Sequence, residues 1–320
     1  MVQLLERYKA LEFLERVRVV DREALLTRDP LAFINTLIPA FLIHVPFQCV
    51  SLVAQTKEEH HVPSLEEVVE MILSLEGGLC YSLNTFMCIL LRTLHLDAHV
   101  LKGSYTSSRQ EHNHVLVLVK DLRHPGDEHI IDVGCGYPLQ EAVAVNSLPV
   151  TYYYCGLEYK YCRKGELVLR LHRRGDTNPD KEQAVMVGEW RQVFHFTLTP
   201  VQYDFFLPYM ASVYVDEKSN FIQSILAARF PTADTVLTEE HSGDTSSSIR
   251  KSNPAKEDNS GKILMAFKDQ ILMLGPFNAI VTTEVSLEEW ATKIKNYFPT
   301  IPPAKVDLAV HNRILNKSLH

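Results

Sequence analysis

The chain has 320 residues, of which 46% are hydrophobic and 22% are charged, and its formal net charge is −7. This composition excludes a protein that is disordered throughout, and the length allows two or three structural units. The negative charge and the lack of a long run of Lys and Arg argue against a nucleic-acid-binding surface. We expect the short basic cluster from Arg170 to Arg174 to be a solvated strand end.

The N-terminus and the cysteines bear on the compartment. Residues 1–9 carry charges from the start and lack the apolar core of a secretory signal, so we expect a cytoplasmic protein. The apolar stretch from Leu31 to Phe47 is interrupted by polar residues and falls short of the roughly 20 residues that a membrane-spanning helix needs. No membrane partner is therefore expected. The six cysteines are irregularly spaced, which favours reduced thiols and no metal site.

Residues 1–97 predict a helical bundle. Apolar residues recur at steps of three and four, which places them on one face of a helix. The predicted helices cover Leu4 to Val17, Leu31 to Leu42, Leu65 to Ser74 and Tyr81 to Leu94.

The segment Glu76-Gly77-Gly78-Leu79-Cys80 opens the last of these helices. Unpaired N–H groups at a helix N-terminus stabilise a thiolate, so Cys80 is a candidate nucleophile. The glycines allow backbone angles closed to other residues and close approach of another chain. Alone, the segment fits equally a Gly-Gly turn followed by a buried cysteine.

Residues 98–198 contain several short β-rich runs, which predict a small β-barrel or a curled sheet. The runs 114–119 and 129–133 flank a turn at Pro125-Gly126-Asp127, which predicts a hairpin centred near residue 124. That register places Asp132 close to the level of His114, as a base and its orienting group require. Taken singly, the histidine fits a core position and the aspartate a strand-end turn.

Residues 199–320 predict an α/β unit. It contains a helix near Tyr203 to Tyr214, strands near Ile222 to Phe230, Lys262 to Phe267 and Gln270 to Leu274, and a closing helix from Ser286 to Tyr297. Within it, residues 238–261 are polar and nearly free of apolar side chains, so we expect a disordered surface insertion there.

Six motifs in order resemble those of the arylamine N-acetyltransferase family over nearly the whole chain. They are Val45-Pro46-Phe47 (VPFEN in the family), Gly77-Gly78-Leu79-Cys80 with Asn84 (RGGxC, then Asn), His114-Val115-Leu116 (HxL), Asp132-Val133-Gly134-Cys135-Gly136 (DxGFG), Phe196-Thr197-Leu198-Thr199-Pro200 (FTLxP), and Tyr214 with Ser219-Asn220-Phe221 (Y…SxF). The resemblance implies an α+β fold with a helical bundle, a β-barrel and an α/β lid. It also implies a Cys-His-Asp core like that of papain-like proteases and transglutaminases.

The resemblance further implies ping-pong acetyl transfer from acetyl-CoA to an arylamine or hydrazine. By this resemblance, Cys80 is the acyl-accepting nucleophile, His114 is the base, and Asp132 orients His114. Coenzyme A is placed near Tyr214 and Ser219, with Gly134 lining the mouth. Phe47 and Cys135 are placed in the substrate pocket. A monomer with no metal is expected.

Three positions depart from the family pattern. Glu76 stands where the family has Arg, and Gln48 where it has Glu. In the family, these two residues form a salt bridge that braces the segment here called the cysteine loop, residues 76–80. We expect the Glu76 carboxylate to accept a hydrogen bond from the Gln48 amide instead, since a buried unpaired carboxylate is costly. Cys135 stands where many members have a pocket Phe, which predicts a wider acceptor site.

Two other functions remain open from the sequence. A cysteine hydrolase or transglutaminase-like acyltransferase would use the same three residues with a different acyl donor. A binding protein that kept the fold with altered activity is the second alternative, and Glu76, Gln48 and the insertion motivate it.

Overall fold

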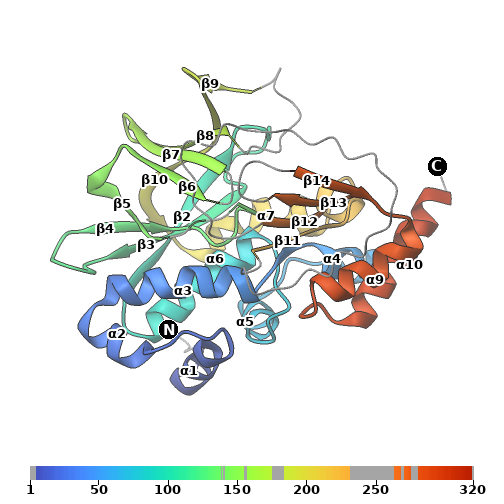
Figure 1. The fold of residues 1–320 in the computed structure, drawn as a ribbon, viewed down its shortest axis with the longest axis horizontal. Helices are drawn as coiled ribbons and strands as arrows, with labels where there is room; N and C mark the ends of the chain where they lie inside the picture. Colours follow the sequence, from blue (N-terminus) through green and yellow to red (C-terminus); the bar gives the residue numbers. More distant parts are fainter. Residues whose placement is uncertain are drawn as a thin grey trace.

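The computed structural model describes residues 5–137, 139, 141–154, 157–174, 184–230, 263–267, 270–274 and 280–318 (Figure 1). It is a mixed fold of helices and two antiparallel sheets. The predicted insertion at 238–261 and Cys155 lie outside the described residues.

Six helices precede the larger sheet. They are α1 (Arg7–Arg16), α2 (Arg22–Arg28), α3 (Pro30–His44), α4 (Val50–Val53), α5 (Leu65–Leu73) and α6 (Cys80–Thr93). The four predicted helices are confirmed to within a few residues at each end. Local signals set two of the starts: the Asp29 side chain accepts from the Ala32 amide at 3.0 Å before α3, and Ser64 and Glu67 form a capping box on α5.

An aromatic cluster joins three of these helices. The ring centroids of Phe13 and Phe86 lie 4.9 Å apart, and that of Phe41 lies 6.4 Å from Phe86. All three side chains are buried. The cluster packs α6, the helix that begins at Cys80, against α1 and α3.

The larger sheet has nine strands in the order β5-β4-β3-β2-β10-β8-β7-β6, with β9 on β10. The strands are β2 (Asp97–Tyr105), β3 (His114–Lys120), β4 (Glu128–Ile131), β5 (Val143–Ala144), β6 (Val150–Tyr154), β7 (Leu157–Lys164), β8 (Leu167–Arg174), β9 (Met186–Val187) and β10 (Trp190–Val201). The sheet is curled (Figure 1), but among the described residues its end strands β5 and β6 do not pair. It is thus a curled half-barrel, which confirms the second of the two predicted forms and not a fully formed barrel.

The predicted hairpin is formed by β3 and β4. Val117 pairs with Ile131 and Leu118 with Ile130, which confirms the predicted centre at residue 124. Asp132 therefore follows directly on the last paired residue of β4. Helix α6 packs on β2 and β3, so the N-terminus of that helix lies beside the start of β3.

The smaller sheet runs β1-β11-β12-β13-β14. Its strands are β1 (Phe47–Gln48), β11 (Leu226–Arg229), β12 (Ile263–Phe267), β13 (Gln270–Leu274) and β14 (Ile280–Glu284). The helices of this part are α7 (Leu207–Tyr214), α8 (Asn220–Gln223), α9 (Leu287–Tyr297) and α10 (Pro303–Ser318). Strand β1 comes from the N-terminal part of the chain, so the segment before the cysteine loop belongs to this sheet.

Some predictions for this part were wrong. The strand expected over 222–230 is only β11, because Ser219 caps the short helix α8 by accepting from the Phe221 amide at 3.3 Å. The helix α10 was not predicted. It packs on α4 and α9 at the right of Figure 1.

Replacing Phe86 by Ala is expected to lower the free energy of unfolding by about 3–5 kcal/mol, since it leaves a cavity among buried rings. Urea denaturation measures this. Leu308→Ala, at a position 50% exposed, is the control and should cost less than about 0.5 kcal/mol. A loss below about 1 kcal/mol for Phe86→Ala would contradict this placement of the core.

Candidate active site

The cysteine loop is held against the segment that carries β1. The backbone amide of Gly78 donates to the Pro46 carbonyl at 3.2 Å, and the backbone amide of Gln48 donates to the Gly78 carbonyl at 2.9 Å. Gly77 has φ +89°, and a Cβ there would lie 2.1 Å from the Pro46 carbonyl oxygen. Both the backbone angle and the close approach therefore require glycine.

Cys80 is the first residue of α6, as predicted. Its side chain is partly buried, and Sγ lies 3.7 Å from the Asn113 carbonyl oxygen, directly before β3. The helix has no side-chain hydrogen bond at its N-cap, Leu79. The partial positive charge of the first helical turn is thus left for an anion at Cys80.

His114 and Asp132 form a buried hydrogen-bonded pair. His114 Nε2 lies 2.8 Å from Asp132 Oδ2, and both side chains are 0% exposed. Burial alone lowers the pKa of His114, but Asp132 and Cys80 outweigh it and raise this pKa to about 9. The Cys80 thiol lies against the carbonyl of Asn113, the residue directly before His114. The other ring nitrogen, Nδ1, has no hydrogen-bond partner among the described residues.

The Asp132 carboxylate is held ionised and oriented by its surroundings. Burial raises its pKa, but the charge and hydrogen bond of His114, with Arg170 and Asn84, bring it below its ordinary value. Oδ1 accepts from Asn84 Nδ2 at 2.9 Å and from the Gly134 amide at 3.1 Å. Because Asn84 lies one turn after Cys80 on α6, it links the cysteine helix to the carboxylate.

Asn84 also joins the two strands of the hairpin. Its Nδ2 donates to the Val115 carbonyl at 2.7 Å, and its Oδ1 accepts from the Val133 amide at 2.9 Å. All of its side-chain polar atoms are thereby used in a fully buried position. The structure brings the sequence-predicted His114 and Asp132 into direct contact, and Asn84 links their hairpin to the helix that begins at Cys80.

The structure also describes Tyr214, Ser219, Phe47 and Gly134, the residues to which the resemblance assigns ligand contacts. Tyr214 is buried, with its hydroxyl 3.2 Å from Ser82 Oγ on α6, and Ser219 caps α8. Phe47 packs its ring 6.5 Å from that of Phe221. Gly134 lies against the start of α6: a Cβ there would be 2.8 Å from the Cys80 Cα and from Asn84 Nδ2. Their assigned coenzyme A and substrate contacts stay predictions.

Arg170 is a site residue that sequence reasoning missed. It was expected on a solvated strand end, but its side chain is 0% exposed, and its guanidinium lies 4.6 Å from the Tyr159 ring centroid. The signal was present: apolar residues surround Arg170 on β8, as in a strand buried on both faces. Its positive charge contributes to the low pKa of Asp132.

Arg170 also changes the interpretation of Cys135. Arg170 Nη1 lies 3.1 Å from Cys135 Sγ, and that thiol donates to the Tyr137 carbonyl at 3.1 Å. Burial raises the pKa of the Cys135 thiol to about 12, so it stays protonated. Arg170 thus lies directly beside the Cys135 side chain.

The expected hydrogen bond between the Gln48 amide and the Glu76 carboxylate is wrong. Gln48 Nε2 instead donates to Ser51 Oγ at 2.9 Å and approaches the Glu76 backbone carbonyl at 3.4 Å. The carboxylate pairs with Lys305 of α10, with Nζ and Oε1 2.6 Å apart. Since α10 was not predicted, this partner could not be anticipated.

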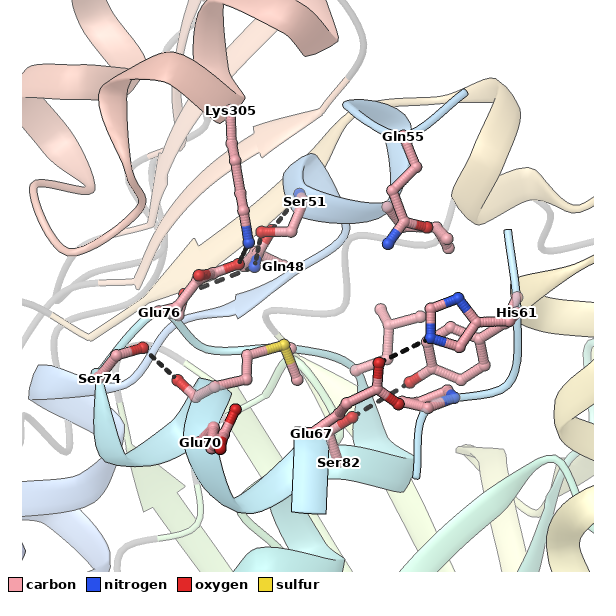
Figure 2. Close-up of a pocket in the computed structure, with 16 residues that line it drawn as sticks. Gln48, Ser51, Gln55, His61, Glu67, Glu70, Ser74, Glu76, Ser82 and Lys305 are labelled. Atoms are coloured by element: carbon pink, nitrogen blue, oxygen red, sulfur yellow. Dashed lines mark hydrogen bonds and ion pairs between the residues drawn. The ribbon is translucent and has the colours of Figure 1, made fainter. Parts of the chain in front are cut away.

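A cavity of about 370 Å³ lies beside this pair (Figure 2). Its lining includes Gln48, Glu76, Gly78, Ser82, Tyr214 and Lys305. Glu76, Gly78 and Leu79 of the segment before Cys80 form part of its wall.

Two other expectations bear on cofactors and membranes. No group of three or more His, Cys, Asp and Glu in the described residues is arranged to hold a metal ion. None of the helices in the described part of the chain combines the length and apolar content that crossing a bilayer requires.

The comparisons with known proteins agree with the fold. A family model described as N-acetyltransferase matches residues 30–271. No match was found among curated protein sequences.

Solved structures of arylamine N-acetyltransferases share the fold at low sequence identity. That of Mycobacterium smegmatis has a TM-score of 0.66 at 15% identity, covering 89% of this chain and 90% of that one. The Salmonella typhimurium structure has 0.65 at 16%, covering 95% and 98%. The Mycobacterium marinum structure, in complex with CoA, has 0.69 at 12%, covering 93% and 97%. With the family model matching well over half of its length, the chain belongs to the arylamine N-acetyltransferase family.

Proposed function

We propose that this acyltransferase moves an acetyl group from acetyl-CoA to an arylamine, a hydrazine or a related amine through an acetyl-Cys80 intermediate. The observation that carries the proposal is the buried His114–Asp132 pair, 2.8 Å apart, beside a cysteine at a helix N-terminus. Family membership and a relative solved in complex with CoA support the choice of donor.

The first half-reaction begins from a Cys80 thiolate and a His114 imidazolium. With a pKa of about 9, His114 is protonated at neutral pH, and the dipole of α6 stabilises the thiolate. Sγ attacks the thioester carbonyl, and the bond from that carbon to the CoA sulfur breaks. The leaving thiolate takes the proton of His114, which leaves acetyl-Cys80, CoA and a neutral imidazole.

The second half-reaction uses the neutral imidazole as a base. The amine nitrogen attacks the acetyl carbon of acetyl-Cys80 and transfers a proton to His114. The carbon–sulfur bond then breaks, so that the amide leaves and the thiolate–imidazolium pair is restored. Asp132 keeps the ring oriented and stabilises its protonated form in both halves.

The proposal keeps the ligand contacts predicted above. Tyr214, Ser219 and Gly134 are assigned to coenzyme A, and Phe47 and Cys135 to the amine pocket. The protein is proposed to act as a cytoplasmic monomer, with the smaller sheet and its helices as a lid. The family match favours acetyl transfer over the hydrolase alternative.

Incubation with acetyl-CoA and no amine is expected to leave one acetyl group on the peptide that contains Cys80. Mass spectrometry of the digested protein measures this. Cys80→Ala should lose the adduct. Cys88→Ala, which changes a buried thiol on the same helix, should keep it. A folded wild-type protein without an adduct would sink the proposal.

The stability of the wild type relative to His114→Gln is expected to depend on pH. The pKa of His114 is about 9 in the folded protein and near 6.5 in the unfolded chain. Between these two pH values the folded state holds a proton on His114 that the unfolded state has lost. The stabilisation is complete below pH 6.5 and falls by about 1 to 3 kcal/mol as the pH rises to 9. Urea denaturation at several pH values measures it. A pH-independent difference would contradict the ion pair.

Gly134→Ala is expected to reduce the rate of Cys80 acetylation by about 10- to 100-fold, because the new methyl group displaces Cys80 or Asn84. Stopped-flow detection of CoA release measures the rate. Gly126→Ala is the control: its φ of +85° strains the turn between β3 and β4, but a Cβ added there would have no other atom within 4 Å. It should retain the wild-type rate. Equal rates for both variants would show that the close approach at Gly134 is unimportant.

A further inference from the structure

The ion pair between Glu76 and Lys305 joins the cysteine loop to the C-terminal helix. Figure 2 shows Lys305 reaching from α10 down to Glu76, with Nζ 2.6 Å from Oε1. The two residues are 229 positions apart in the chain. The contact therefore connects segments that the sequence keeps at opposite ends.

Glu76 stands at a point where its position sets that of the nucleophile. It precedes Gly77 and Gly78 and is four residues before Cys80. Its backbone amide donates to the Met71 carbonyl at 3.2 Å, at the end of α5. Because only three residues separate Glu76 from Cys80, a displacement of Glu76 is expected to displace the first turn of α6 as well.

The exposure of the two side chains makes the pair asymmetric. The Glu76 side chain is 8% exposed, whereas that of Lys305 is 43% exposed. Loss of the lysine would leave a carboxylate that is largely out of water and without its cation. An orphaned buried charge is far costlier than the loss of a surface ion pair. Glu76 would then have to move toward solvent.

Helix α10 is anchored independently of this pair. Asn312 Nδ2 donates to the Val53 carbonyl at 3.0 Å and to the Gln55 carbonyl at 3.3 Å, both at the end of α4. Arg313 donates to the Gln223 carbonyl of α8. These contacts fix the position of α10, and Lys305 lies in its first turn.

We propose that Lys305 and Glu76 are positioning residues, through which the C-terminal helix holds the Cys80 loop in its reactive arrangement. The pair does the bracing that the family pattern assigns to an Arg and a Glu at positions 76 and 48. Here the charge at position 76 is negative, and its partner comes from α10 and not from position 48. The inference rests on the proposed role of Cys80 as nucleophile.

The test compares Lys305→Met with Lys295→Met. Lys295 forms a more exposed pair with Asp307, 2.5 Å apart, in the same C-terminal region. Two rates are measured at about 25 °C: carboxamidomethylation of Cys80 by iodoacetamide, and acetylation of Cys80 by acetyl-CoA. Lys305→Met is expected to lower both by about 3- to 30-fold, and Lys295→Met to change neither by more than about twofold.

Two further variants separate positioning from general destabilisation. Lys305→Arg keeps the cation and should retain both rates within about threefold. Glu76→Gln added to Lys305→Met removes the orphaned charge and should recover most of the lost rate. Circular dichroism at the same temperature is used to establish that each variant is folded.

Wild-type rates in a folded Lys305→Met protein would overturn the inference. Equal losses in the Lys305→Met and Lys295→Met variants would also overturn it, because they would indicate loosening of the whole C-terminal region. Alkylation distinguishes this failure from that of the proposed function. If wild-type Cys80 is alkylated but never acetylated, the acetyl-transfer proposal fails while the comparison of alkylation rates still decides the positioning role.

Discussion

The hydrogen bond between His114 and Asp132 is the constraint around which the rest of the site is built. Both side chains are fully buried, so each charge is stabilised chiefly by the other. The hairpin of β3 and β4 meets this requirement by its register, which brings residue 132 beside the start of β3. The packing of α6 on β2 and β3 then brings Cys80 to the same point.

Support for this pair comes from three directions. Asn84 ties it to the cysteine helix, Arg170 supplies a buried positive charge from β8, and Gly134 lets α6 approach closely. The segment from Glu76 to Cys80 is itself held at two points, by the bridge of Gly78 to Phe47 of β1 and by the ion pair of Glu76 with Lys305. Residues from the N-terminal helices, the half-barrel and the C-terminal helix thus converge on one cysteine.

Local pattern was enough to predict the helix that begins at Cys80 and the hairpin that carries His114 and Asp132. The periodicity after Cys80 and the turn between β3 and β4 placed both elements, because each depends on neighbours in the chain. Arg170 was misjudged because a basic cluster is usually solvated, and its burial depends on aromatic partners from two neighbouring strands, β7 and β10. The partner of Glu76 was also missed, because it comes from α10, far along the chain.

The central claim is that the acetyl group passes through Cys80 to the amine. It is tested most directly by isolating the acetylated protein free of CoA and mixing it with an arylamine. The account predicts that Cys80 loses its acetyl group as an equal amount of acetylated amine appears. Retention of the acetyl group, or release of acetate with the amine unchanged, would contradict it.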